Sequence, residues 1–95
     1  MTMSTNPRQK EAFEVDVAVL EERQRELMLH NDDVNTFDHV IECLVEICGH
    51  DPIQAEQCAW IVHYKGKCSV KRGPIDTLRP QCEALLDRGL SAQIK

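Results

Sequence analysis

The clearest pattern in the chain is an apolar stripe of helical period that follows a cluster of polar turn residues. Between residues 37 and 47, apolar side chains recur at steps of three and four positions, which is the spacing of one buried helix face. The stripe consists of Phe37, Val40, Ile41, Leu44 and Ile47. Asn35 is predicted to cap the start of this helix, and Gly49 is predicted to end it.

Two further helices are predicted downstream. Asp51 and Pro52 have the residue types of an N-cap and a first helical position, and the buried face of this helix is expected to contain Ala55, Cys58, Ala59, Ile61 and Val62. The last helix is predicted to begin at Asp76 or Thr77, so that Pro80 falls in its first turn, where a missing N–H costs little. Its apolar stripe is Leu78, Cys82, Leu85 and Leu86.

Three short strands separate and flank these helices. Residues 27–29 are an apolar run after a charged segment, Cys68 and Val70 alternate with polar residues, and residues 90–94 form the last strand. The order is therefore strand, helix, helix, strand, helix, strand. This order predicts an α+β two-layer domain in which a three-stranded, mostly antiparallel sheet packs against three helices.

Composition and charge narrow the possible functions. The chain has 95 residues and a net charge of −5, and an acidic protein is a poor partner for nucleic acid. Residues 1–24 are polar and acidic, so we expect a flexible N-terminal extension before a core domain of residues 25–95. No apolar run approaches the roughly 18 residues that span a membrane, and the N-terminus lacks the apolar core of a secretory signal. A cytoplasmic protein without a membrane partner is predicted.

The five cysteines and four histidines do not have the spacing of a metal site. The cysteines form no C-x-x-C pair, and the histidines form no H-x-x-x-H pair. Most of the cysteines fall within apolar patterns, so we interpret them as small buried hydrophobic residues in a reducing compartment. Neither a metal nor another cofactor is predicted.

A polar turn between the first strand and the first helix permits two interpretations. Asn31, Asp32 and Asp33 follow one another there, and such side chains commonly hydrogen-bond to the nearby backbone and stabilise a turn. The same oxygen atoms could instead form a site for a cation. These three residues alone favour the turn.

Two segments of this chain are NDDVNTFDHVIECL and, about thirty residues after its polar turn, AEQCAWIVHYKGK. Together they resemble the signature of the ClpS family, the bacterial adaptors of Clp AAA+ proteases. The family has an N-D-D turn before its first helix and a V-H-x-x-G sequence at the end of its second, which here are residues 31–33 and 62–66. The resemblance covers residues 27–94 and implies a fold similar to the C-terminal domain of the ribosomal stalk protein. It also implies a function. ClpS proteins bind proteins whose first residue is large and apolar, a degradation signal called an N-degron. They deliver these proteins to the ClpA or ClpC unfoldase for degradation by ClpP.

The resemblance implies a site for the N-terminal amine of such a substrate. An ammonium group has three donors, so its site should place several acceptors around one point. The implied amine-binding residues are Asn31, Asp33 and His63, with Asp32 beside them in the loop. His63 at this position makes the cation site the preferred interpretation of the polar turn.

A hydrophobic pocket for the first side chain is implied as well, formed by Leu29, Asn35, Phe37, Val40, Ala59, Val62 and Leu90. Phe37 and Ala59 stand where many ClpS proteins have methionine. Alanine removes volume and phenylalanine fills part of it, so we expect a changed preference among first residues. Trp60 is expected on a different side of the helix from the pocket.

The resemblance places the unfoldase contact at Tyr64, Asp76 and Gln81, and Gln81 replaces a lysine that is common in the family. The residues also permit two alternative functions. An enzyme could use Asp32, Asp33 and His63 as acid and base, but the chain has no nucleophile motif, metal spacing or phosphate loop, so no enzyme is predicted. The remaining alternative is a non-catalytic, ribosomal-stalk-like interaction domain that shares only the fold.

Overall fold

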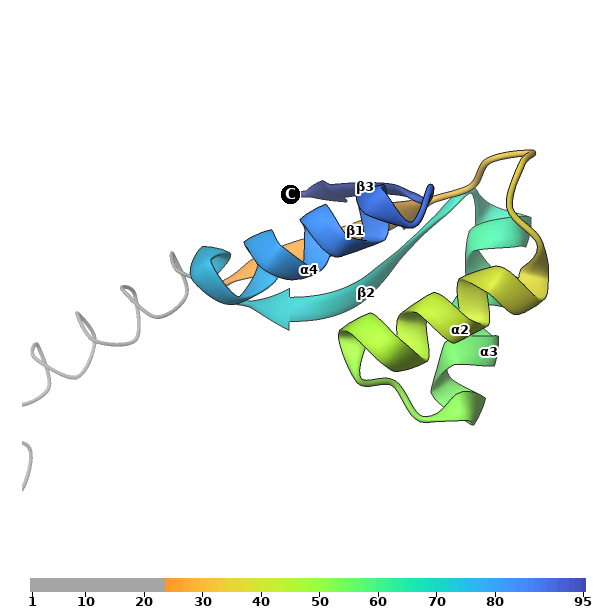
Figure 1. Ribbon diagram of the computed structural model, residues 1–95, viewed down its shortest axis with the longest axis horizontal. Helices are drawn as coiled ribbons and strands as arrows, with labels where there is room; N and C mark the ends of the chain where they lie inside the picture. The colour runs from red at the N-terminus through yellow and green to blue at the C-terminus, as the bar shows by residue number, and fades with distance from the viewer. Residues whose placement is uncertain (1–23) are drawn as a thin grey trace, which may run out of the picture.

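The computed structural model describes residues 24–95. Residues 24–95 form six elements in the predicted order (Figure 1), which confirms the α+β class. They are β1 (Arg25–His30), α2 (Phe37–Cys48), α3 (Pro52–Lys65), β2 (Lys67–Gly73), α4 (Ile75–Asp87) and β3 (Ser91–Ile94). Apart from Gln24, the predicted N-terminal extension lies outside the described residues.

The sheet has the order β2-β1-β3, and β1 is antiparallel to both of its neighbours. At one end of β1, His30 pairs with Lys67 of β2 and with Ser91 of β3. Three segments therefore meet at this end of the sheet: the loop after β1, the end of α3 and the turn before β3. The backbone N–H of Asn31 donates a hydrogen bond to the carbonyl of Gly66 at 2.8 Å and joins two of these segments.

The three helices bury a core against the sheet and against one another. Helix α4 packs on β3 and β1, α3 packs on β2, and α2 contacts both α3 and α4 (Figure 1). The largest fully buried side chains are Leu27, Leu29, Leu44, Leu78, Leu85, Cys43 and Cys48. All five cysteines are free thiols and four are buried, so the prediction that most of them are small apolar core residues is confirmed.

The ends of α2 and α3 are set by caps that the sequence located in part. Asp51 caps α3 as predicted, since its side chain accepts a hydrogen bond from the N–H of Gln54 at 2.9 Å. The prediction that Asn35 caps α2 was wrong. Thr36 is the N-cap, and its hydroxyl accepts from the N–H of His39 at 3.1 Å. The side chain of Asn35 is instead engaged by Asp32 and by the turn before β3.

Helix α4 begins earlier than predicted. It starts at Ile75, so Pro80 is its sixth residue and not part of its first turn. Pro74 is the N-cap and provides no side-chain cap, and its carbonyl accepts the first intrahelical hydrogen bonds, from the N–H groups of Thr77 and Leu78. The predicted start at Asp76 or Thr77 is therefore one or two residues late.

Two residues of the predicted apolar stripes are exposed. Ile61 is 40% exposed and Leu86 is 49% exposed, so their assignment to buried faces was wrong. Each lies directly beside a buried residue, Val62 or Leu85, and successive helical residues are 100° apart. In both α3 and α4, the helix face that packs on the neighbouring elements is therefore narrower than the predicted apolar stripe.

Candidate functional site

A cavity of about 270 Å³ opens at the end of the sheet where the central strand, β1, ends. It is lined by the loop after β1, the first turns of α2 and the last turns of α3. The lining residues are Asn31, Asp32, Asp33, Asn35, Phe37, Val40, Ala59, Val62 and His63. All of them belong to the amine site or the pocket implied by the sequence, so the fold brings residues from three segments to one place.

Two of the implied pocket residues do not line this cavity. Leu29 and Leu90 are almost fully buried, with 1% and 4% exposed, and they line a small adjoining hollow of about 20 Å³. Val40 and Val62 line both spaces. Leu29 and Leu90 therefore pack beside the two valines. They support the cavity wall that Val40 and Val62 form and do not line the cavity themselves.

The cavity has polar groups that are free to accept a ligand. Asn31, Asp33 and His63 are exposed, and within residues 24–95 their side chains form no hydrogen bond or ion pair. His63 lies in the last turn of α3. An amide oxygen, a carboxylate and an imidazole nitrogen are thus available around one opening, and each can accept a hydrogen bond.

Asp32 has a different environment from Asp33, because its carboxylate is already engaged within the loop. It accepts hydrogen bonds from the backbone N–H groups of Val34 at 3.0 Å and Asn35 at 2.9 Å, and from the side-chain amide of Asn35 at 2.8 Å. Burial raises the pKa of Asp32, but hydrogen bonds from Asn35, Val34 and Ser91 together outweigh burial and lower the pKa below its ordinary value. Asp32 therefore stabilises the turn and also keeps a negative charge beside the cavity.

The loop is tied to the turn between α4 and β3 by two adjacent carbonyl groups. The side-chain amide of Asn35 donates to the carbonyl of Gly89 at 2.9 Å, and Nε2 of His39 lies 2.9 Å from the carbonyl of Arg88. Because a carbonyl only accepts, His39 must carry its proton on Nε2 in this contact. Both bonds hold the turn that leads into Leu90 against the start of α2.

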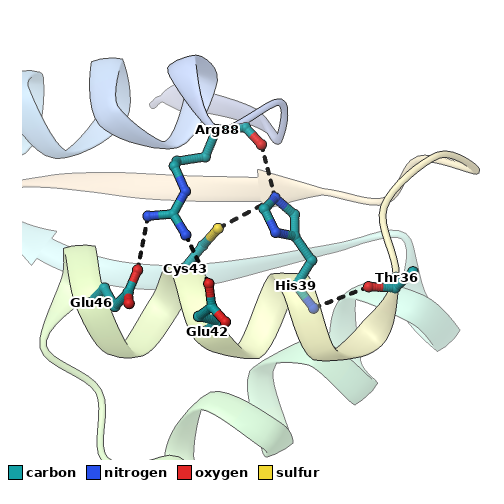
Figure 2. A network of polar contacts seen from close by, with 6 residues as sticks. All are labelled: Thr36, His39, Glu42, Cys43, Glu46 and Arg88. Atoms are coloured by element: carbon teal, nitrogen blue, oxygen red, sulfur yellow. Dashed lines mark hydrogen bonds and ion pairs between the residues drawn. The ribbon is translucent and has the colours of Figure 1, made fainter.

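Figure 2 shows the rest of this network, which sequence reasoning missed. The guanidinium of Arg88 at the end of α4 reaches Glu46 at 2.9 Å and Glu42 at 3.1 Å on α2. The thiol of Cys43 lies 3.6 Å from Nε2 of His39. The residues on the two sides are more than 40 positions apart in the sequence, and no local pattern relates them. Only the packing of α4 on α2 brings them together.

Aromatic rings form one side of the cavity and continue beyond it. Phe37 lines the cavity, and its ring centroid is 4.4 Å from that of Trp60. Trp60 does not line the cavity, in agreement with the expectation from the sequence, but its contact with Phe37 was not anticipated. Trp60 also stacks on Tyr64, with centroids 5.2 Å apart and ring planes 7° apart. These two residues are four positions apart on α3 and so occupy the same helix face.

The residues implied for an unfoldase contact do not form one compact group. Tyr64 is 72% exposed near the end of α3, and Asp76 is exposed in the first turn of α4. The seven-residue strand β2 runs between them and places them roughly 20 Å apart. Gln81 is half-buried, and its side-chain oxygen is buried without a hydrogen-bond partner among the described residues.

No group of three or more histidine, cysteine, aspartate or glutamate residues within residues 24–95 could hold a metal ion. None of the described helices combines the length and the apolar character that crossing a membrane requires.

Comparisons with known proteins agree with one another. The family model of the ATP-dependent Clp protease adaptor protein ClpS matches residues 20–93. A curated relative from Corynebacterium aurimucosum, an ATP-dependent Clp protease adapter protein ClpS, is 30% identical over 89 residues, covering 94% of this chain and 80% of the relative. A relative of the same name from Thermosynechococcus vestitus is 38% identical over 65 residues, covering 64% of this chain and 66% of the relative.

The fold is also found in a solved structure. The structure of Agrobacterium tumefaciens ClpS2 bound to L-phenylalaninamide has a TM-score of 0.71 and 19% sequence identity, and the match covers 77% of this chain and 95% of that chain.

Proposed function

The chain belongs to the ClpS family of adaptor proteins of the ATP-dependent Clp protease, and from this we propose that it binds proteins through a large hydrophobic N-terminal residue. The observation that carries the proposal is the cavity at the end of β1, which combines apolar walls with acceptors at its opening that have no partner within residues 24–95. A substrate of this kind has two matching parts, an ammonium group for the acceptors and an apolar side chain for the apolar walls. The bound protein is then delivered to an unfoldase.

The substrate amine is bound by Asn31, Asp33 and His63. Charge-assisted hydrogen bonds of this type contribute about 1.5–3 kcal/mol each. The carboxylate of Asp32 adds negative charge while it holds the loop in shape. Two carboxylates beside one cavity favour a free amine strongly over an acetylated one, because acetylation removes both the charge and two donors.

The first side chain enters between Phe37, Val40, Ala59 and Val62. Burial of a leucine or phenylalanine side chain contributes about 1.5–3 kcal/mol. The small side chain of Ala59 leaves room that a larger residue would fill. The relative ClpS2 has been solved with L-phenylalaninamide, a ligand with a free amine and an aromatic side chain, and this supports the same substrate chemistry here.

Delivery requires a partner, for which we propose ClpA or ClpC acting with ClpP in the cytoplasm. Tyr64, Asp76 and Gln81 stay our candidates for the contact, and Asp76 is the one whose side chain is most accessible, at 92%. The chain itself is proposed to perform no reaction. A ribosomal-stalk-like interaction domain is the competing function, and it differs because it has no requirement for a free amine.

Fluorescence anisotropy of a labelled peptide that begins with leucine tests the proposal. We expect acetylation of its N-terminus to weaken binding at least ten-fold, and Asp33→Ala to weaken binding of the free peptide. Asp76→Ala is the matched control, since it removes another exposed carboxylate on a different element and should leave the affinity unchanged. Equal binding of free and acetylated peptides would contradict the proposal and favour the stalk-like interaction domain.

A further inference from the structure

We propose that Arg88 is a positioning residue for the amine site, although it lies at the end of α4 and does not line the cavity. It fixes the turn before β3 against α2, and this turn holds the loop that carries Asn31 and Asp33. The inference rests on the proposed function, because it assumes that the loop binds a substrate amine. It extends that function to a residue that controls affinity for the amine without contact with the substrate.

The side chain and the backbone of Arg88 both contact α2 (Figure 2). Its guanidinium lies 3.1 Å from a carboxylate oxygen of Glu42 and 2.9 Å from one of Glu46, two residues that share a helix face. Its carbonyl lies 2.9 Å from Nε2 of His39, near the start of the same helix. A guanidinium holds its N–H groups in one plane, so contact with two carboxylates fixes its direction as well as its distance. The three contacts therefore fix residue 88 relative to α2.

The turn after Arg88 connects this fixed point to the loop after β1. Gly89 has a φ of +87°, a left-handed conformation that ends the helix and turns the chain toward β3. Its carbonyl accepts a hydrogen bond from the side-chain amide of Asn35 at 2.9 Å. The carbonyls of residues 88 and 89 belong to consecutive peptide units, so the position of the second depends on how firmly the first is held.

Asn35 connects the turn to the carboxylate at the centre of the loop. Its amide group donates to the carbonyl of Gly89 at 2.9 Å and to the carboxylate of Asp32 at 2.8 Å. Asp32 lies between Asn31 and Asp33 in the sequence, so it orients the backbone from which both of these side chains extend. If the carbonyl of Gly89 is displaced, Asn35 loses one of its two partners and the loop is held less firmly.

Binding of an ammonium group is sensitive to such a displacement, because several acceptors must lie around one point. Hydrogen bonds weaken steeply when their angles become unfavourable, and a binding site needs its side chains held to within about 0.5 Å. Residues that act on a ligand through other residues alter its binding by about two- to thirty-fold. An effect of this size on peptide affinity can be measured.

Arg88→Gln tests the inference, since it removes the charge and retains a polar side chain. We expect it to weaken binding of a labelled peptide that begins with leucine about three- to ten-fold, measured by anisotropy. A peptide that begins with phenylalanine should lose affinity by the same factor, because the two peptides have the amine in common. Arg79→Gln is the matched control, since it removes an exposed arginine that pairs with Asp76 on the same helix, and it should bind like the wild type.

If Arg88 acts through α2, its contacts should behave as one unit. The double variant of Glu42→Gln and Glu46→Gln should weaken binding as much as Arg88→Gln does, and all three changes together should cause no further loss. His39→Gln keeps an N–H that can donate to the carbonyl of Arg88, so it should retain most of the affinity that His39→Leu loses. Circular dichroism and urea unfolding establish that each variant is folded under the conditions of the binding assay.

The possible results separate the inference from the function on which it rests. If the wild type requires a free amine but folded Arg88→Gln binds as well as Arg79→Gln, the inference is overturned and the proposed function stands. The inference is also overturned if the losses from α2 and from Arg88 add, or if leucine and phenylalanine peptides lose affinity by different factors, since the effect then lies at the apolar wall. If acetylated peptides bind the wild type as well as free ones, the proposed function fails and the inference fails with it.

Discussion

Two neighbouring carboxylates in the loop after β1 differ in what they contact, and this difference leads to separate predictions. Asp32 accepts hydrogen bonds from Val34 and Asn35, whereas Asp33 is exposed and has no partner within residues 24–95. We expect Asp32→Ala to lower the free energy of unfolding by about 0.5–2 kcal/mol, the range found for side chains that cap backbone N–H groups. Asp33→Ala should weaken peptide binding without changing stability. Urea unfolding and anisotropy on both variants would distinguish these effects.

The contribution of Asp32 to stability should depend on pH in a defined direction. Its pKa in the folded protein lies below the ordinary value of 3.8, so the folded state binds a proton less readily than the unfolded state does. The stabilisation is therefore present in full at neutral pH and is lost as the pH falls below about 4. Asp32→Asn should reduce the loss of stability between pH 5 and pH 3, measured by urea unfolding at each pH. If Asp32→Asn loses as much stability between pH 5 and pH 3 as the wild type, other titrating groups cause the loss of stability in this pH range.

The small side chain at position 59 leads to a prediction about substrate choice. Ala59 lines the cavity and is 5% exposed, so methionine there would occupy space that the first side chain of the substrate needs. Overpacking of this kind costs about 1–3 kcal/mol. We expect Ala59→Met to weaken binding of peptides that begin with tryptophan or phenylalanine at least five-fold, and to weaken leucine peptides less. Gln57→Met, on an exposed position of the same helix, is the control. A uniform loss across all first residues would indicate general damage to the site.

At the scale of elements, regular packing was predictable and irregular ends were not. Leu78, Cys82 and Leu85 recur with helical spacing and are buried as predicted, because burial of a stripe dominates helix formation. Pro80 misled the prediction, since a proline is expected near a helix start. In α4 the buried stripe outweighs the cost of an internal proline, and the exposed position of Pro80 lets its ring avoid the core.

Pro80 should consequently be a weak point of α4. A proline in a helix interior costs up to about 3 kcal/mol, because it removes one hydrogen bond and crowds the preceding turn. Part of this cost is offset by the lower entropy of the unfolded chain. We therefore expect Pro80→Ala to raise the free energy of unfolding by about 1–2 kcal/mol in urea, while Arg79→Ala, its exposed neighbour, should have little effect. Destabilisation by Pro80→Ala would show that the proline contributes a contact that α4 needs.

For the whole molecule, the resemblance pointed to the residues that line the cavity, together with Leu29 and Leu90, which do not line it. It did not show what positions these residues. The resemblance named the lining residues because they lie in two short segments, residues 31–40 and residues 59–63. The bonds from Asn35 to Gly89 and from His39 to Arg88 connect residues about 50 positions apart, and no periodicity relates them. The contact of Trp60 with Phe37 depends on how α2 and α3 cross. Such contacts follow from the packing of the entire chain, so a local pattern cannot reveal them.

Binding and delivery should be separable at Asp76, because the structure places this candidate contact far from the cavity. The cavity opens at the end of the sheet where β1 ends, whereas Asp76 lies in the first turn of α4, after the far end of β2. Asp76→Lys reverses an exposed charge and should leave peptide affinity within two-fold of wild type. It should slow degradation of a reporter that begins with leucine by the unfoldase and ClpP. Asp87→Lys, at the end of α4, is the control for net charge. If Asp76→Lys and Asp87→Lys slow degradation equally, the effect is one of overall charge, and Asp76 is not part of the unfoldase contact.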